Sequence, residues 1–283
     1  DIKLKKNRIK DIKKKYKNFI FFQRDIKNLK SIEPIFKKNK IDVVINLAAN
    51  PGIRASIENP LKIFNNNISG FFQILLLLKK YKIKKLLFAS TSSAYGNLNK
   101  KSYVENDLNN TPLQMYSASK VTNEVMAHVF SNLYNIKCIG LRFFTVFGPW
   151  GRPDMAYFKF VNHIKNNQSI KIFNYGNHKR DFTYVDDITD GIFLAHLKIN
   201  NIFKKKAIPF EILNLGNTNS VSIIRLVKTL EKKLSKKAKI KFVKKQDGDM
   251  LNTKSNINRA KKLLNYYPKI SFDEGIKKFL DWH

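Results

Sequence analysis

Several kinds of residue are scarce in this chain of 283 residues, and each scarcity excludes a class of protein. Cys138 is the only cysteine, which excludes a disulfide framework and a thiol-rich metal site. No apolar run approaches the roughly 18 to 20 residues of a membrane-spanning helix. The longest run, Phe71 to Leu78, is interrupted by Gln73. No segment resembles a signal peptide, so we expect a cytoplasmic protein with no membrane partner.

Acidic residues are also scarce, with 21 Asp and Glu against 54 Lys and Arg, which gives a formal net charge of +33. Such an excess often indicates a protein that binds nucleic acid or an anionic membrane surface. Here the cations are 46 Lys and only 8 Arg, spread over the whole length together with 32 Asn. A phosphate-binding patch is usually clustered and richer in Arg. We therefore expect a solvated basic surface and no nucleic-acid partner.

Apolar runs typical of buried strands alternate with segments typical of helices. This alternation predicts an α/β fold with a doubly wound parallel sheet, in which ligands bind beyond the carboxyl ends of the strands. The predicted strands are 18–23, 42–48, 85–90, 137–143, 169–173 and 210–215. The predicted helices are 2–17, 31–38, 60–81, 117–134, 186–198, 222–235, 256–264 and 273–282.

The loops that follow three of these strands carry the polar and aromatic residues of interest. They read NLAANPGIR, STSSAYG and FFTVFGPWGRPDM. Between Leu141 and Asp187 the chain also places Arg142, Arg152 and Arg180 among many aromatic rings. Guanidinium groups match carboxylate and phosphate oxygens two at a time. This stretch therefore predicts a pocket for an anionic ligand that contains a ring.

Tyr116 and Lys120 form a Tyr-x-x-x-Lys motif at the start of a predicted helix, where this spacing puts both side chains on one face. An ammonium group near a phenol favours the phenolate and lowers its pKa, so that the tyrosine can act as a general base. The motif also begins at Tyr81 and Tyr175, so it carries little weight alone. Its position between the STSSAYG loop, which offers the Thr91 hydroxyl, and the arginine-rich stretch selects Tyr116.

These residues resemble a known family. The matching segments are NLAANPGIRASIENP, NNISG, FASTSSAYG, YSASKVTNEVMAH, LRFFTVFGPWGRPDMAYFKF, NYGNHKRDFTYVDDI, ILNLGN and DGDM, and they cover nearly all of residues 20–265. The chain resembles the extended short-chain dehydrogenase/reductases and, within them, the UDP-glucuronate 4-epimerases. The run GPWGRPDM with KRDFTY is specific to that subgroup.

The resemblance implies roles for the residues around the motif. Tyr116 would be the general base at the 4-hydroxyl group of the sugar. Lys120 would lower the pKa of Tyr116 and hold the nicotinamide ribose. Thr91 would bond the same sugar hydroxyl group, with Ser92 and Ser93 beside it on the substrate side.

The resemblance also implies positions for the rest of the substrate and for the cofactor, NAD. Thr145 and Arg152 would hold the carboxylate of the sugar, and Arg180 would hold the diphosphate. Arg54 and Asp249 match further substrate-side positions. The cofactor-side positions are Asp25, Ala48, Ala49, Asn67, Tyr116 and Lys120.

The implied reaction is the 4-epimerisation of UDP-glucuronate to UDP-galacturonate through a 4-keto intermediate, with no net redox change. The resemblance implies a homodimer joined by helices near 61–80 and 117–134. It also implies a truncated Rossmann-like part at 1–145, to which 174–216 returns. A smaller interleaved nucleotide-sugar part would comprise 146–173 and 217–283.

One family feature is missing from these residues. The family pattern opens with a strand and G-x-x-G-x-x-G, whose backbone amides approach the cofactor pyrophosphate. The 11 glycines begin at Gly52 and contain no such cluster. We expect the chain to begin after the second strand of the family pattern, with roughly 30 or more residues and the central strand absent.

Two alternatives stay open. The chain could be an epimerase or dehydratase of another nucleotide sugar, which would not need Thr145 and Arg152. It could also be an inactive fragment that binds anions through its basic surface, in a way that collapses with salt. We expect Arg142 to be a buried structural arginine. The histidines have no metal-like spacing, so we expect no metal site and histidines that are exposed or hydrogen-bonded.

Overall fold

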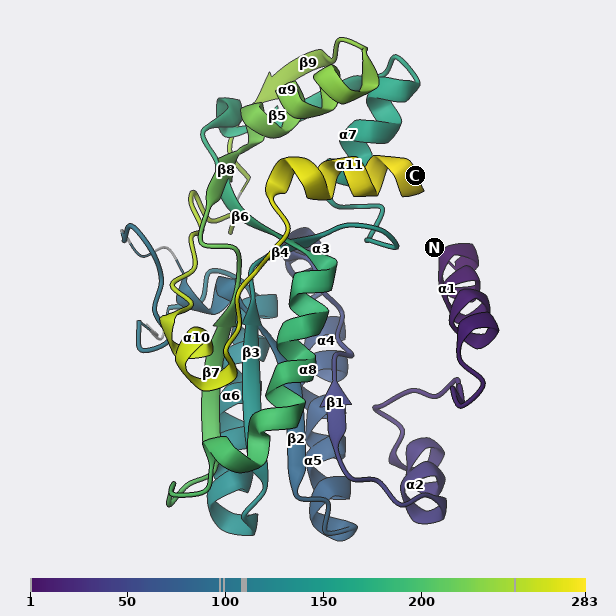
Figure 1. Cartoon of the computed structure of the whole chain (residues 1–283), viewed down its shortest axis with the longest axis vertical. Helices are drawn as coiled ribbons and strands as arrows, with labels where there is room; N and C mark the ends of the chain where they lie inside the picture. Colours follow the sequence, from purple (N-terminus) through teal and green to yellow (C-terminus); the bar gives the residue numbers. More distant parts are fainter. Residues whose placement is uncertain (1, 97, 99, 108–110, 247) are drawn as a thin grey trace.

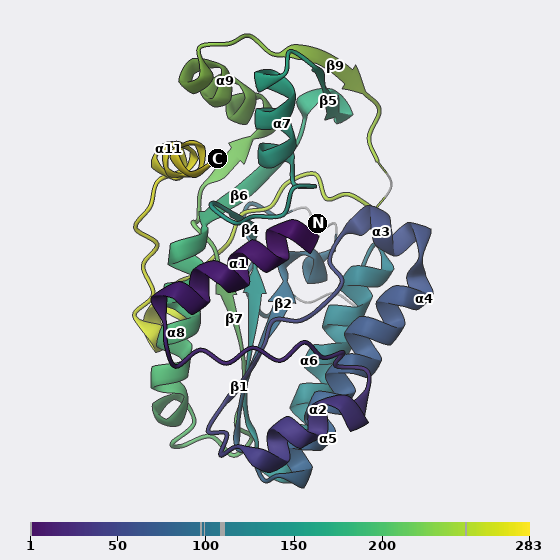
Figure 2. The ribbon, with the colours of Figure 1, turned by 90° about the vertical axis from the view of Figure 1, so that its right-hand side faces the viewer.

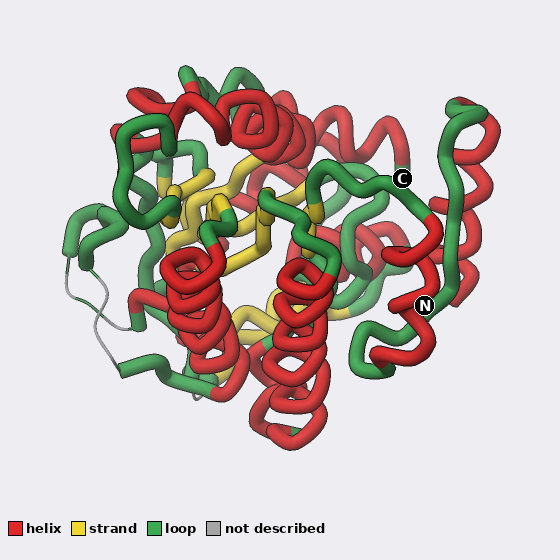
Figure 3. The backbone as a smooth tube through the Cα atoms, turned by 90° about the horizontal axis from the view of Figure 1, so that it is seen from below, coloured by secondary structure: helices red, strands yellow, loops and turns green. Residues whose placement is uncertain are grey.

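The computed structural model describes residues 2–96, 98, 100–107, 111–246 and 248–283. Its centre is a four-stranded sheet in the order β1-β2-β3-β7, in which all the neighbouring strands are parallel (Figure 1). The strands are β1 (Val44–Asn46), β2 (Lys85–Thr91), β3 (Lys137–Phe143) and β7 (Phe210–Leu215). Helices cover both faces, and from below the strands lie between them (Figure 3). The predicted doubly wound α/β fold is confirmed.

Successive strand residues face opposite sides of the sheet, which explains why these strands are continuously apolar. Leu86 and Phe88 pack against helices on one face, whereas Leu87 packs against helices on the other. The first face is covered by α5 (Gly70–Lys80) and α6 (Met115–Tyr134). The second face is covered by α8 (Val185–Ile202) and α10 (Asn258–Leu264).

The predicted helix 60–81 is α4 (Pro60–Ile63), a π-helical turn at Phe64–Ser69, and α5 in succession. The expectation that no segment approaches a membrane span is wrong by this measure, because residues 60–80 together are long and apolar enough by length and composition to cross a membrane. Phe71, Leu75 and Leu78 of this segment are buried against the sheet. The segment thus supplies core residues of the α/β fold.

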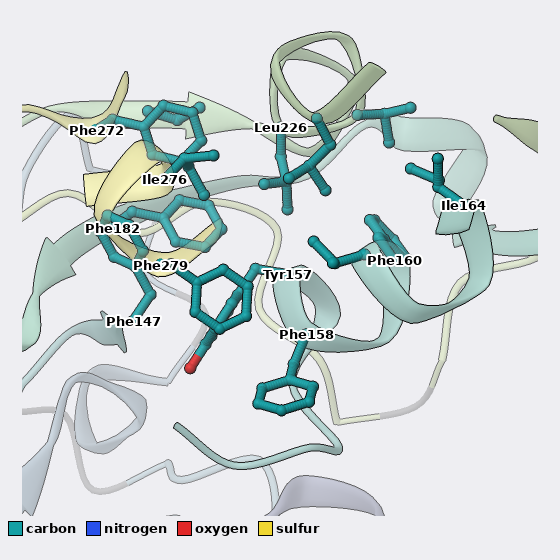
Figure 4. Close-up of a cluster of buried hydrophobic side chains, with 14 of the residues drawn as sticks. Phe147, Tyr157, Phe158, Phe160, Ile164, Phe182, Leu226, Phe272, Ile276 and Phe279 are labelled. Carbon is teal, nitrogen blue, oxygen red and sulfur yellow. The ribbon is translucent and has the colours of Figure 1, made fainter. Parts of the chain in front are cut away.

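A second cluster of secondary structure lies beyond the carboxyl ends of the central strands. It contains a sheet in the order β4-β6-β8, a parallel β5–β9 pair and three helices around an aromatic core (Figure 4). Phe147 meets Phe182 edge to face, with ring centroids 5.8 Å apart. The elements are β4 (Thr145–Phe147), β5 (Ser169–Phe173), β6 (Lys179–Tyr184), β8 (Ser220–Ser222), β9 (Lys239–Val243), α7 (Ala156–Lys165), α9 (Ile223–Leu234) and α11 (Phe272–Trp282). The domain boundaries given above remain a prediction.

The chain before β1 lies on the outside of the molecule (Figure 2). It forms α1 (Ile2–Lys15) and α2 (Leu29–Lys38), joined by a segment without regular structure. The strand predicted at 18–23 is wrong, because no strand in the described part of the chain pairs with this segment. Phe21 and Phe22 are instead exposed.

Candidate active site

The loops that follow β2 and β3 meet the start of α6 beyond the carboxyl edge of the central sheet. Thr91 is the last residue of β2, and Tyr116 is the second residue of α6. Thr91 and the charge of Arg152 both act to lower the pKa of the Tyr116 phenol, so the three side chains lie in one neighbourhood. The structure thus brings together Thr91, Tyr116 and Arg152, three residues that the sequence assigned to one site.

Hydrogen bonds fix the backbone at the start of α6. The Gln114 side chain caps the helix by accepting from the Ser117 amide at 2.7 Å. Ser119 Oγ donates to the Tyr116 carbonyl oxygen at 2.7 Å and accepts from Asn67 Nδ2 at 3.1 Å. Asn67 Oδ1 also accepts from the Asn50 amide at 2.7 Å. Asn67 therefore ties the loop after β1 to the turn that carries Tyr116.

Lys120 is almost completely buried, at 2% exposure, and its ammonium group donates to the Ala89 carbonyl oxygen at 2.8 Å. Burial lowers the pKa of Lys120 to about 8, and the charge of Glu124 opposes this shift. Burial raises the pKa of Tyr116, against the opposing effects of the Thr91 hydrogen bond and the Arg152 charge. The expectation that Lys120 lowers the pKa of Tyr116 is therefore wrong in this structure, because Lys120 is directed at Ala89.

Arg152 lies in the loop after β4, close to the NPGIR loop that follows β1. Its guanidinium group forms a two-pronged ion pair with Asp154, with Nε donating to Oδ1 at 3.0 Å. A Cβ atom added to Gly52 would lie 3.6 Å from Arg152 Nη2, so the NPGIR loop passes close to this charge. Thr145 begins β4 and pairs with Phe182 of β6. Arg152 is thus accessible, with 37% of its side chain exposed. It is paired with the Asp154 carboxylate, and its charge acts on Tyr116.

Arg180 and Asp249, both predicted on the substrate side, lie together. Arg180 Nη2 donates to Asp249 Oδ1 at 2.7 Å, and Nη1 donates to the Leu251 carbonyl oxygen at 3.0 Å. His178 lies in the same cluster, with Nε2 buried, without a hydrogen-bond partner and 3.8 Å from Asp249 Oδ2. The expectation that every histidine is exposed or hydrogen-bonded is therefore wrong for His178. Burial and the charge of Arg180 lower the pKa of His178.

The remaining predicted site residues lie in the turn after β2, in the loop after β1 and near the start of α2. Ser92 is buried and Ser93 half-buried in the 3₁₀ turn after β2, where the Ser93 amide donates to Thr91 Oγ1. Ala48 and Ala49 occupy the loop after β1. Asp25 is exposed and lines an open hollow with Asn28, Asn65 and Ser69.

Arg54 directs its side chain into solvent. It lies on α3 (Ile53–Glu58) with 79% of its side chain exposed, and it pairs with Glu58 at 2.8 Å. This i, i+4 pair on a helix surface is typical of a solvated ion pair of small energetic value.

Arg142 is the buried structural arginine that the sequence predicted, at 1% exposure. It binds both oxygens of Glu124, at 2.8 and 2.7 Å, and donates to the Glu105 carbonyl oxygen at 2.9 Å. Its guanidinium carbon lies 4.7 Å from the centroid of the Tyr95 ring. This network fixes α6 against the central sheet. Among the described residues, no group of three or more His, Cys, Asp and Glu side chains could hold a metal ion.

Arg8 was not among the residues predicted from sequence, and its guanidinium group reaches the loop that carries Arg152. Arg8 Nη2 donates to the carbonyl oxygens of Trp150 and, at 3.4 Å, of Gly151. The available signal was composition, because Arg8 is the one arginine in a helix whose other cationic residues are all lysines, in a chain with 8 Arg and 46 Lys.

Comparison with known proteins identifies the family. Residues 3–216 match the model of the NAD dependent epimerase/dehydratase family. The chain belongs to this family. It is 40% identical over 283 residues to the UDP-glucuronate 4-epimerase of Thermodesulfobacterium geofontis, covering 100% of this chain and 84% of that protein. It is 39% identical over 292 residues to Protein CapI of Staphylococcus aureus, covering 100% of this chain and 87% of that protein.

The structure agrees with the sequence comparison. It superposes on the UDP-glucuronic acid 4-epimerase of Bacillus cereus, solved in complex with UDP-glucuronic acid and NAD, with a TM-score of 0.89 and 34% identity. That alignment covers 99% of this chain and 86% of the other. It also superposes on the UDP-glucose 4-epimerase of Thermotoga maritima, solved with UDP-glucose, with a TM-score of 0.86 and 26% identity over 94% of this chain and 85% of that chain.

Proposed function

We propose that this protein is an NAD-dependent isomerase that interconverts UDP-glucuronate and UDP-galacturonate by epimerisation at C4 of the sugar. The observation that carries the proposal is the group formed by Thr91, Tyr116 and Arg152, in which a tyrosine hydroxyl, a neighbouring threonine and a cation share one site. Relatives named UDP-glucuronate 4-epimerase that match the whole chain support this choice of substrate. The rivals are epimerases and dehydratases of other nucleotide sugars.

Tyr116 and Thr91 handle the proton of the 4-hydroxyl group. Reversible removal of hydride from C4 is the chemistry that NAD supplies when bound in this family. Tyr116 in its deprotonated form accepts the proton as the C4–O bond becomes a carbonyl, and the resulting phenol returns it when the alcohol re-forms. Thr91 lies beside Tyr116 and would bond the same sugar hydroxyl group, which would hold that group close to the phenol. Rotation of the 4-keto sugar between the two steps exposes its other face.

Arg152 and Thr145 determine the choice of a sugar acid. Arg152 holds the Asp154 carboxylate by two hydrogen bonds, so its geometry suits a carboxylate of the substrate equally well. A firmly held carboxylate also protects the product, because a 4-keto sugar acid is a β-keto acid and can lose carbon dioxide. Arg180 supplies the matching charge for the diphosphate.

The residues present fit one end of NAD. An ammonium group has three donors, and Lys120 uses one on Ala89, which leaves donors for the hydroxyl groups of the nicotinamide ribose. Ala48 and Ala49 in the loop after β1, and Asn67, which is hydrogen-bonded to that loop, would contact the cofactor, and Asp25 would meet the adenosine end. The glycine-rich loop for the pyrophosphate is not among these 283 residues. We therefore propose that NAD must be supplied in excess in any assay of this chain.

We also propose that the protein is a homodimer. Three apolar residues at successive turns of α6 are exposed: Val125, Val129 and Leu133. Phe72 of the neighbouring α5 is 39% exposed and meets Phe130 of α6 edge to face. Paired helices with a shared apolar face are typical of an interface between two copies.

Light scattering after size exclusion measures the mass of the particle, which should be twice the chain mass of 33.0 kDa. Leu133→Glu should give the monomer mass. Leu197→Glu is the matched control, because Leu197 is similarly exposed on α8 across the sheet and should leave the dimer intact. A monomeric wild-type protein would contradict the proposed assembly.

The direct test of the reaction is incubation of the chain with NAD and UDP-glucuronate, and separately with UDP-glucose. Proton NMR of the anomeric region distinguishes the products. The coding sequence upstream of Asp1 should be read first, and any additional residues that it encodes should be included in a parallel assay. We expect UDP-galacturonate from the acid and little or no UDP-galactose from the neutral sugar. Faster turnover of UDP-glucose would favour a rival epimerase.

A further inference from the structure

Arg8 connects the N-terminal helix to the loop that carries Arg152. Helix α1 contains no buried residue, and it lies across the face of the molecule in front of β4 (Figure 2). Its Arg8 nevertheless donates from Nη2 to the carbonyl oxygens of Trp150 and Gly151. These contacts join positions more than 140 residues apart in the chain, so they constrain the fold of the loop and not only the local helix.

The loop itself is tightly constrained at the point that Arg8 reaches. Gly148 has φ 138° and Trp150 has φ 58°, which is an unfavourable value for a bulky residue. A Cβ atom added to Gly151 would lie 1.8 Å from the Tyr157 hydroxyl oxygen, so only glycine fits there. Such a turn directs consecutive carbonyl groups outward. A guanidinium fork can donate to both of them, whereas a lysine ammonium is a compact point charge.

Two cations meet at this loop. Burial raises the pKa of Tyr157 to about 12, against the opposing effects of the Gly148 backbone and of the charges of Arg152 and Arg8. The side chain of Trp150 packs on Trp282 of α11, with ring centroids 5.2 Å apart. The loop is therefore held by α1 through its backbone and by α11 through a side chain.

We propose that Arg8 is a positioning residue, which clamps the turn at residues 148–151 so that the adjacent Arg152 presents its guanidinium group to the acid group of the substrate. This inference rests on the proposed function of Arg152. Arg8 itself contacts carbonyl groups of the protein, and it acts on the substrate through Arg152. Loss of Arg8 should leave the machinery at Tyr116 intact and weaken the selection for a sugar acid.

Tryptophan fluorescence tests the clamp without any substrate, because the chain has only 2 Trp and Trp150 lies in the loop itself. In a Trp282→Phe background, Arg8→Met should increase the quenching of Trp150 by acrylamide by about twofold or more, because the loop loses a charge-assisted anchor. The acrylamide quenching of Trp150 in Arg8→Lys should lie between that of the Trp282→Phe background and that of Arg8→Met. Lys10→Met is the control, because Lys10 is exposed on the same helix and its loss changes the net charge equally. Equal quenching in Arg8→Met and Lys10→Met would overturn the clamp.

Steady-state kinetics test the consequence for the substrate. Arg8→Met should raise KM for UDP-glucuronate about tenfold with kcat within about twofold, the pattern of lost uniform binding. The affinity for UDP, which lacks the sugar acid, should not change. An unchanged KM, or an equal loss of UDP affinity, would contradict the inference. If the wild-type protein ignores UDP-glucuronate, the proposed function fails, and the fluorescence measurement still decides whether Arg8 holds the loop.

Discussion

Arg180 Nη2 lies 2.7 Å from the carboxylate of Asp249, in a cluster that is largely shielded from solvent. A diphosphate that enters this cluster must offer Arg180 at least as good an acceptor. Arg180→Gln should therefore weaken UDP binding by about tenfold to a hundredfold, because charge-assisted bonds to phosphate are strong. Isothermal titration calorimetry with UDP measures this change. Arg225→Gln is the control, since Arg225 pairs with Asp273 on the exposed surface; equal losses in both variants would contradict the assignment.

Tyr116→Phe should lower kcat by at least about a hundredfold, because a positioned general base contributes about 10² to 10⁴ in rate. Circular dichroism should show an unchanged fold. The chain provides a matched control in Tyr175→Phe, which alters another Tyr-x-x-x-Lys motif at an exposed position. That variant should keep full activity. Turnover by Tyr116→Phe close to that of the wild-type protein would exclude Tyr116 as the base.

The buried Lys120 should make stability depend on pH. Burial lowers its pKa to about 8 from 10.5, so between these values the unfolded chain binds more protons at this position than the native protein. Below about pH 8 Lys120 is protonated in both the native and the unfolded state, so the free-energy cost of burying its charge does not change with pH. As pH rises through this window, the free energy of unfolding therefore increases.

Urea unfolding of the wild-type protein and Lys120→Met measures this linkage. The wild-type protein should gain about 1.5 kcal/mol relative to the variant from about pH 8 to about pH 9.5. Lys10→Met, at an exposed position, should show no such trend relative to the wild-type protein. A difference between wild type and Lys120→Met that stays flat across this range would show that Lys120 titrates normally.

Glu124→Gln should destabilise the protein by about 3 to 5 kcal/mol, because it leaves the buried charge of Arg142 without a counter-ion. The double variant Arg142→Met with Glu124→Leu removes both charges and should recover much of this loss. Urea unfolding measures all three proteins. A double variant less stable than Glu124→Gln would show that the contacts of Arg142 with Tyr95 and Glu105 matter more than its charge.

The central sheet could be predicted from sequence because its strands are continuous apolar runs covered on both faces. The elements that the sequence did not predict are short or partly polar, such as β4, α7 and β8. Their residues gain structure from the shared aromatic core around Phe147 and not from local periodicity. The strand predicted at 18–23 was wrong although the segment is an apolar run. Such a run forms a strand only where a neighbouring strand pairs with it.

Much of the candidate site was also accessible to sequence reasoning. Loops that follow parallel strands converge, which is why Thr91, Tyr116 and Arg152 could be grouped in advance. The direction of the pKa shift of Tyr116 could not be predicted, because it depends on burial and on Lys120 bonding to Ala89. Arg8 could not be placed either, since its contact with the distant turn at Trp150 exists only in the folded chain.

The most direct test of the account uses UDP-glucuronate with deuterium at C4 of the sugar, incubated with the protein and NAD in ordinary water. A hydride removed from C4 and returned to the other face never exchanges with solvent. Mass spectrometry and proton NMR of the product should therefore find UDP-galacturonate that keeps its deuterium at C4. Loss of the deuterium to water, or inversion at a carbon other than C4, would contradict the proposed reaction.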